Sequence, residues 1–203
     1  MPQPPPSSAA SADSIDYDAI YRARQDSARM RFTEADAEFV AGMIAHHAQA
    51  LVMSEMAPTH GASPAIRTLT ARIINAQRDE IAIMQRWLRL RDQPVPQIHI
   101  EGTVLTIHGS EHAGHMMPGM LTPEQIDPLD AARGEAFDRL FLEYMIQHHQ
   151  GAVTMVLDLL KVDGALQDEA VFKLASDIQV DQTTEIARME KMLAQIPAGG
   201  RSR

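Results

Sequence analysis

Two pairs of adjacent histidines stand in apolar stretches between methionines. His46–His47 lies in FVAGMIAHHAQALVM (39–53), and His148–His149 lies in FLEYMIQHHQGAVTM (141–155). Imidazole nitrogen and thioether sulfur, in a chain without cysteine, are donors that suit Cu(I) and, by the same soft-ligand preference, Ag(I). A structural interpretation competes, because a histidine on an apolar helix face is often a core residue bonded to a carboxylate. Clustering favours the metal, since each unsatisfied buried polar group costs roughly 1–3 kcal/mol.

The two stretches match without a gap at an offset of 102 residues, from His46 to His148. A second pair, RIINAQRDEIAIMQRWL (72–88) and DIQVDQTTEIARMEKML (177–193), matches at an offset of 105. We interpret the chain as a duplicated unit and call its halves the first and second copy. Apolar residues recur at i, i+4 and i+7, which predicts helices. Two hairpins of helices bury their apolar faces against one another, so we expect an all-α four-helix bundle.

On such helices His46 and His148 share a face with the neighbouring methionines, whereas His47 and His149 lie on the flank. If the copies are related by a pseudo-two-fold axis, the two faces meet. The candidate metal ligands of these helices are Met43, His46, His47, Met53, Met145, His148, His149 and Met155. The partner helices supply residues that could surround the ligands and orient the imidazoles, namely Gln77, Glu80, Met84, Gln182, Glu185 and Met189.

A proline-rich linker (91–128) separates the copies and is too long for a simple turn. Its stretch QIHIEGTVLTIHG (97–109) is compatible with a short hairpin around Glu101 and Gly102. The following HGSEHAGHMMPGM (108–120) is rich in histidine and methionine, a composition that binds metals without a preformed site. The linker therefore adds the candidate ligands His108, His112, His115, Met116, Met117 and Met120.

Composition limits the partners of the chain. With 203 residues, a net charge of −9 and no stripe of Lys and Arg, a nucleic-acid partner is excluded. No apolar run approaches the roughly 20 residues of a membrane span. The Pro/Ser/Ala-rich opening MPQPPPSSAASADS indicates a flexible tether, and we expect an exported protein. The expected organisation is a disordered or weakly ordered segment 1–30, a bundle 31–195 with repeats 33–90 and 129–195, and a disordered tail 196–203.

Other polar residues are expected to be structural. Asp36 and Asp138 precede matching phenylalanines by three residues and should serve at helix starts. His60 and His99 are isolated, and we expect both to face solvent. No Glu-x-x-His occurs, which disfavours a ferritin-type di-iron centre. No nucleophile motif or phosphate-binding loop appears.

The doubled MI-x-HH-x-x-A-x-x-M, the two Q-x-x-EI-x-x-M helices and the linker HMMPGMLTPEQ resemble domain-of-unknown-function family 305 over about residues 36–193. The resemblance implies a ferritin-like four-helix fold and a periplasmic or secreted location. As in CopM-type members, it also implies binding of Cu(I) or Ag(I) in metal resistance. The matching positions it implicates are Met43, His46, His47, Met53, Met145, His148, His149, Met155, His115, Met116, Met117 and Met120.

We therefore expect a metal-binding protein that sequesters or transfers Cu(I), with silver possible and other metals open. It would be a monomer or homodimer without turnover, with a metal exporter or chaperone as a candidate partner. One alternative is a ferritin-like redox enzyme in which His46, His148, Glu80 and Glu185 hold a metal pair. Another is a structural or partner-binding bundle whose buried His–Glu pairs provide specificity without metal.

Overall fold

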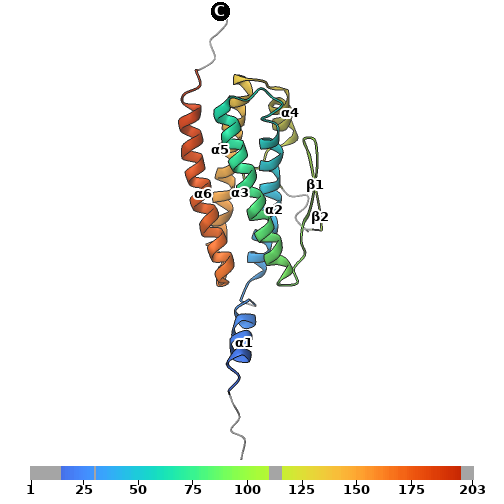
Figure 1. Ribbon diagram of the computed structural model, residues 1–203, viewed down its shortest axis with the longest axis vertical. Coiled ribbons are helices and arrows are strands. Elements are labelled where there is room, and N and C mark those ends of the chain that lie inside the picture. The colour runs from blue at the N-terminus through green and yellow to red at the C-terminus, as the bar shows by residue number, and fades with distance from the viewer. Residues whose placement is uncertain (1–14, 30, 110–115, 198–203) are drawn as a thin grey trace, which may run out of the picture.

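The computed structural model describes residues 15–29, 31–109 and 116–197, and this part of the chain is mostly helical (Figure 1). Its helices are α1 (Tyr17–Arg29), α2 (Glu34–Glu55), α3 (Pro64–Arg89), α4 (Pro123–Ala131), α5 (Glu135–Leu159) and α6 (Glu169–Leu193). A small antiparallel sheet of β1 (Gln97–Glu101) and β2 (Val104–His108) lies between α3 and α4 in the sequence. The expected predominance of helix is confirmed, and the sheet is an addition to the all-α prediction.

Four long helices lie side by side in Figure 1, with α2 and α6 running in one direction and α3 and α5 in the other. α2 packs against α3 and α5, and α5 also packs against α6. None of the described helices has an apolar stretch long enough to span a membrane. The apolar side chains form two clusters, which we call the first core and the second core. The first core includes Phe39, Met43, Met84, Trp87, Met155 and Ile178, and the second includes Met53, Leu69, Phe137, Phe141, Met145 and Met189.

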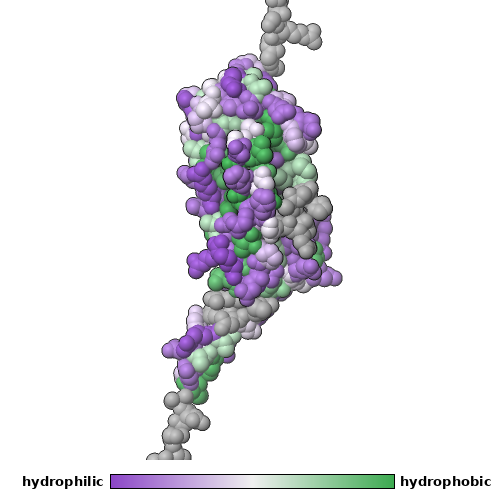
Figure 2. Space-filling model, turned by 90° about the vertical axis from the view of Figure 1, so that its right-hand side faces the viewer, coloured by the Kyte–Doolittle hydropathy of each residue, from purple (hydrophilic) through white to green (hydrophobic). Residues whose placement is uncertain are grey.

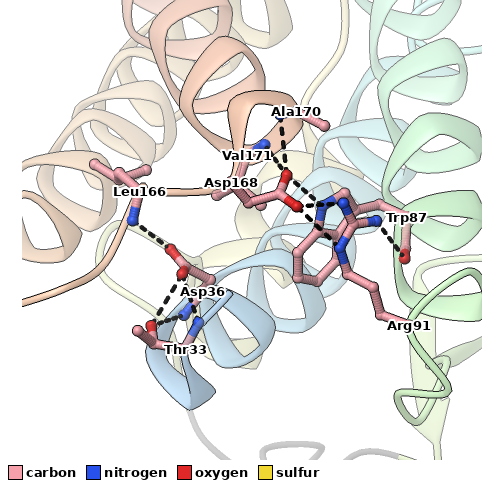
Figure 3. Close-up of polar contacts among 8 residues, drawn as sticks. All are labelled: Thr33, Asp36, Trp87, Arg91, Leu166, Asp168, Ala170 and Val171. Carbon is pink, nitrogen blue, oxygen red and sulfur yellow. Dashed lines mark hydrogen bonds and ion pairs between the residues drawn. The ribbon is translucent and has the colours of Figure 1, made fainter. Parts of the chain in front are cut away.

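Two buried aspartates tie each copy to the other. Asp36 closes the capping box of α2 with Thr33, and its Oδ1 also accepts a hydrogen bond from Leu166 N at 2.8 Å (Figure 3). Asp138, in the first turn of α5, makes the corresponding bond to the first copy: its Oδ1 and Oδ2 accept from the backbone N of Ser63 at 3.2 and 3.3 Å. Each aspartate thus holds the loop that precedes the second long helix of the opposite copy. We expected Asp36 to act at the start of a helix, and it does, because its side chain takes part in the capping box of α2.

A buried ion pair joins the end of α3 to the start of α6. Asp168 caps α6 by accepting from Ala170 N and Val171 N, and it also accepts from Trp87 Nε1 at 3.2 Å and from the Arg91 guanidinium (Figure 3). The guanidinium also lies over the Trp87 ring, 4.3 Å from its centroid. Burial alone would raise the pKa of Asp168, but the hydrogen bonds from Arg91 and Trp87 outweigh burial and hold the pKa below 3.8.

The linker is largely structured. β1 pairs with β2 so that Gln97 faces His108 and Glu101 faces Val104, which confirms the expected hairpin around Glu101 and Gly102. Gly102 has φ +60°, a conformation that glycine adopts without steric cost. The hairpin packs on α2, on the side of the molecule that Figure 2 shows. Helix α4 was not predicted, and it extends past residue 128, where we expected the linker to end. It begins at Pro123 because Thr122 caps it and proline is tolerated in the first turn of a helix.

Two other expectations need correction. Residues 17–29, within the segment expected to be disordered or weakly ordered, form α1, whose first turn is capped by the Asp16 carboxylate accepting from Ala19 N at 2.9 Å. Its described side chains, including Tyr17 and Tyr21, are exposed, and hydrophobic surface on it is visible in Figure 2. His60 is buried rather than solvent-facing, because its Nε2 bonds to Asp130 O and Oδ1 at 2.9 and 3.0 Å.

The buried ion pair predicts a large cost for removing one charge. Asp168→Asn can still cap α6, but it leaves the Arg91 guanidinium buried without a counter-charge, and we expect a loss of about 3–5 kcal/mol of unfolding free energy. Urea unfolding measures it. The matched control is Asp158→Asn, which breaks the exposed pair with Lys161 and should cost less than about 0.5 kcal/mol. Equal losses in the two variants would contradict this role of the ion pair.

Candidate metal centre

The contact between α2 and α5 brings one histidine from each copy together. The ring centroids of His46 and His148 lie 3.8 Å apart with an interplanar angle of 36°. Both residues are only 1% exposed. The expectation that these two helix faces meet therefore agrees with the arrangement of the rings.

Both imidazoles are neutral at physiological pH. Burial and, to a lesser extent, the neighbouring His47 lower the pKa of His46 to about 3, although a hydrogen bond to Pro118 opposes the shift. Burial, followed by the other three imidazoles, holds the pKa of His148 well below 6.5. A neutral imidazole keeps a nitrogen lone pair, which is the form that binds metals.

The hydrogen bonds indicate which nitrogens carry the lone pairs. His46 Nε2 donates to Pro118 O at 3.0 Å, because a carbonyl can only accept, so Nδ1 carries the lone pair. That Nδ1 is buried and has no hydrogen-bond partner among the described residues, and the same is true of both ring nitrogens of His148. Such unpaired buried nitrogens are unusual and are commonly explained by an absent ion or water.

The outer histidines are each bonded to a glutamate. His47 Nε2 lies 2.7 Å from Glu80 Oε2, and His149 Nε2 lies 2.8 Å from Glu185 Oε2. Both imidazoles are fully buried, whereas the two glutamate side chains are 14% and 17% exposed. A carboxylate on Nε2–H leaves Nδ1 as the acceptor, and Nδ1 of each ring is buried without a partner among the described residues. The glutamates therefore occupy the orienting position that the sequence predicts, but beside the outer histidines.

A linker segment lies directly on this helix contact. A Cβ added at Gly151 of α5 would be 1.9 Å from Pro118 O and 2.6 Å from Gly119 Cα, so only glycine permits the approach. Gln49 of α2 fixes the same segment, because its Nε2 donates to Leu121 O at 2.9 Å and its Oε1 accepts from Leu121 N at 2.7 Å. The backbone that receives the His46 hydrogen bond is thus held from both helices.

The same segment places a methionine against α2, one helical turn before His46. Gly42 lies one helical turn before His46, and a Cβ at Gly42 would be 3.4 Å from Met117 Sδ and 3.5 Å from Met155 Cε. Met43 and Met84 also belong to the first core, with which Met117 packs. Met53, Met145 and Met189 belong to the second core. The structure therefore divides the predicted methionines into two groups, and the side-chain ends of Met117 and Met155 meet at Gly42.

Other predicted residues are not part of this group. His108 ends β2 and is exposed, while His112 and His115 lie outside the described residues. Met116 and Met120 line a cavity of about 340 Å³ between β2, α2 and α4. Gln77 and Gln182 are buried and lie near the two glutamates. Within the described ranges, no three His, Asp or Glu side chains come close enough together to hold one ion.

A family profile decides the relationship of the chain. The profile of the domain of unknown function DUF305 matches residues 36–193. The chain belongs to the DUF305 family. Among curated proteins, none matches the chain.

Solved structures of DUF305 proteins share this fold. A candidate secreted DUF305 protein from Streptomyces coelicolor is 27% identical with a TM-score of 0.65, covering 83% of this chain and 98% of that one. A DUF305 fragment from Deinococcus radiodurans is 32% identical with a TM-score of 0.65, covering 81% and 98%. CopM in its Cu(I)-bound form is 29% identical with a TM-score of 0.57, covering 78% and 95%. Structures of CopM in Cu(II)-bound and Ag-bound forms also match, at 30% and 29% identity.

Sequence reasoning missed the residues that hold the linker in this DUF305 chain. These residues occupy positions at which the two copies differ. Gly42 corresponds to Tyr144, and Gln49 corresponds to Gly151, at the offset of 102 residues. Gln147, whose Nε2 donates to Gly119 O at 3.3 Å, replaces an alanine of the first copy. These mismatches between the two copies could have indicated the contact with the linker. The linker occurs only once, so the residues that contact it need not match between the copies.

The close approach at Gly151 predicts a site-specific cost for one added methyl group. Gly151→Ala should lose about 1–3 kcal/mol of unfolding free energy and shift the NMR signals of His46, because the linker backbone must move away. Gly42→Ala is the matched control: its Cβ meets only the movable ends of Met117 and Met155, and alanine favours a helix by roughly 0.5–1 kcal/mol. Similar losses for both variants would refute a specific contact.

The buried neutral histidines predict a pH-dependent stability. Between the ordinary pKa of 6.5 and the folded value of about 3, the unfolded chain binds a proton at His46 that the folded chain excludes. The unfolding free energy should therefore fall as pH decreases from 6.5, by on the order of 1 kcal/mol per pH unit for each such histidine. His46→Gln keeps a donor for Pro118 O but cannot titrate. Urea unfolding from pH 7 to 4.5 should show a shallower slope in this variant, and an unchanged slope would contradict the assignment.

Proposed function

We propose that this DUF305 protein binds Cu(I) or Ag(I) through imidazole and thioether donors. The observation that carries the proposal is the set of unpaired, neutral imidazole nitrogens of His46 and His148, with the side-chain ends of Met117 and Met155 against Gly42, one helical turn before His46. Nitrogen and sulfur donors without charge suit a soft monovalent ion. A bound ion would also relieve the cost of leaving these nitrogens without partners.

The carboxylates support binding without turnover. Glu80 and Glu185 are bonded to His47 and His149, so they are used to orient the outer imidazoles. A redox centre made of His46, His148 and both glutamates would need these carboxylates at the inner histidine pair. Their present partners favour a role in positioning.

Known relatives support metal binding at the level of the family. CopM, at 29–30% identity, has been solved with Cu(I), Cu(II) and Ag. We carry over metal binding as a proposal, and assign Met117, Met155, His46 and His148 as the ligands in this chain from its own geometry. Met53 and Met145 are assigned to packing, because they lie in the second core, whereas Met155 lies in the first core and Met117 packs against it.

The cellular role is proposed on the same basis. We infer a periplasmic or secreted protein that sequesters the metal or passes it to an exporter or chaperone, as a monomer or homodimer. The opening segment and the candidate secreted relative from Streptomyces coelicolor support export. We further propose that the four long helices form a ferritin-like bundle that arose by duplication of one helix pair. The matching sequences at offsets of 102 and 105 residues support the duplication.

Silver titration tests the ligand set. In the double variant Met117→Leu/Met155→Leu, the Ag(I) affinity should fall at least about tenfold, equal to roughly 1.4 kcal/mol, because two soft donors are lost with little change of volume. The affinity is measured by competition with a chelator of known Ag(I) affinity, together with native mass spectrometry for stoichiometry.

The control carries the same two substitutions in the second core. Met53→Leu/Met145→Leu should keep the Ag(I) affinity within about threefold, since both side chains belong to the second core, whereas Met155 belongs to the first core and Met117 packs against it. Equal losses in the two double variants would disprove the proposed ligand set. Undetectable Ag(I) and Cu(I) binding by the unaltered protein would overturn the function itself and favour a structural bundle.

A further inference from the structure

One face of helix α1 is apolar and exposed. Four of its side chains recur at i, i+3, i+4 and i+7 and therefore share this face, namely Tyr17, Ile20, Tyr21 and Arg24. Tyr17, Ile20 and Tyr21 are 73%, 43% and 64% exposed. Figure 1 shows α1 beyond the end of the bundle, next to the start of α2. A helix of 13 residues is only marginally stable in water by itself, so this face is suited to packing on another surface.

The bundle has an apolar cavity at the same end. The cavity has a volume of about 500 Å³ and lies between the last turns of α3 and the first turns of α6. Its apolar lining consists of Ile83, Trp87, Leu90 and Leu174. Ile83 and Leu90 are 55% and 49% exposed. Large apolar side chains that gather in one exposed groove are typical of a surface that binds another protein segment.

The charges beside this cavity differ from those further along the same helices. Arg91 and Asp168 pair with each other, so the cations Arg86 and Lys173 outnumber the remaining carboxylate, Glu169. A second cavity, of about 180 Å³, also lies between α3 and α6, and its charged lining is mainly acidic, with Glu80, Asp181 and Glu185 against Arg72. We call the two cavities together the α3–α6 groove. The groove is thus apolar with a basic rim at one end and acidic at the other.

Helix α1 has complementary features at the same spacing. Asp18 follows Tyr17 at its N-terminal end, and Arg24 lies on the face of Tyr17 seven residues later. Seven residues of a helix span about 10 Å. On α3, Trp87 of the apolar cavity and Glu80 of the acidic cavity are also seven residues apart. If α1 lay antiparallel to α3, Tyr17 would enter the apolar cavity and Arg24 would meet the carboxylates.

The position of Phe32 indicates which copy supplies the helix. Phe32 is three residues beyond the end of α1 and packs edge-on against Trp87 of its own chain, with ring centroids 5.4 Å apart. The Arg24 end of α1 is therefore held near the apolar end of its own groove. If α1 folded back along its own α3, Arg24 would lie in the apolar part and Tyr17 beside the carboxylates. A second copy can supply α1 in the opposite direction, in which both the apolar and the charged groups match.

We propose that α1 of each chain binds the α3–α6 groove of a second copy. The exchange is reciprocal and gives a closed dimer with two-fold symmetry. Each bound helix would cover the exposed edges of Glu80 and Glu185, the carboxylates bonded to His47 and His149. The dimer forms from surfaces of the chain itself and does not depend on bound metal.

Reversal of one charge tests the interface in metal-free protein. Sedimentation equilibrium should show a dimer for the unaltered chain, and Arg24→Glu should weaken dimerisation at least about tenfold, because a carboxylate would face Glu80, Asp181 and Glu185. Adding Asp181→Arg to that variant should restore the dimer. The matched control is Arg22→Glu, which makes the same charge change on the opposite side of α1 and should have an effect within about twofold. A monomer at every concentration would overturn the proposal, as would equal effects of the two reversals.

Crosslinking distinguishes a second copy from the chain's own groove. The chain has no cysteine, so the pair Tyr17→Cys/Leu90→Cys introduces the only thiols. Mild oxidation of metal-free protein should give a covalent dimer on a denaturing gel, whereas Arg22→Cys/Leu90→Cys should give little. A disulfide within one chain would show that α1 folds back and would overturn the exchange. Since neither experiment uses metal, a failure here and a failure of Ag(I) binding are distinguishable.

Discussion

The close contact between the linker backbone and Gly151 is the constraint on which the candidate centre depends. Because nothing larger than a hydrogen fits between α5 and Pro118 O, the linker can lie across the α2–α5 contact. From there Pro118 fixes the tautomer of His46, and Met117 reaches Gly42. A substitution that lifted the linker would at once remove the hydrogen bond from His46 and the thioether of Met117 from Gly42. The centre is therefore made by three segments that are distant in the sequence.

The linker also makes the centre asymmetric. The four histidines, their glutamates and most of the methionines occupy matching positions in the two copies. By themselves they would give a centre with two equivalent halves. Met117 can lie beside Gly42, whereas the matching position of the second copy carries Tyr144. Gln49 binds the linker, whereas its counterpart Gly151 admits it. One segment that occurs once thus converts a repeated arrangement into a single proposed soft-metal site.

Periodicity and the repeat predict much of this arrangement. The spacing of apolar residues predicted the long helices, and the matched positions predicted that His46 and His148 would face one another. The glutamates were expected near the imidazoles for a chemical reason, since a ring nitrogen needs an orienting partner. Each of these inferences uses local spacing or a symmetric match, which a sequence displays directly.

Contacts that depend on the path of the chain could not be predicted in this way. The linker was expected to bind metal through composition, but nothing in its sequence says that Pro118 would lie over Gly151. His60 looked isolated because its partner Asp130 is 70 residues away. Helix α1 was missed because composition suggested a tether, although Asp16 accepts a hydrogen bond from Ala19 N in its first turn. Long-range backbone contacts require the fold itself.

The reciprocal bonds of Asp36 and Asp138 have a consequence for how the chain folds. Each aspartate completes a loop of the other copy, so neither helix pair satisfies its own loop donors until the second pair has docked. The arrangement resembles the isologous interface of a homodimer enclosed within one polypeptide. Long-range contacts of this kind slow folding but couple the two halves. We therefore expect the two helix pairs to form and unfold together, in one cooperative transition.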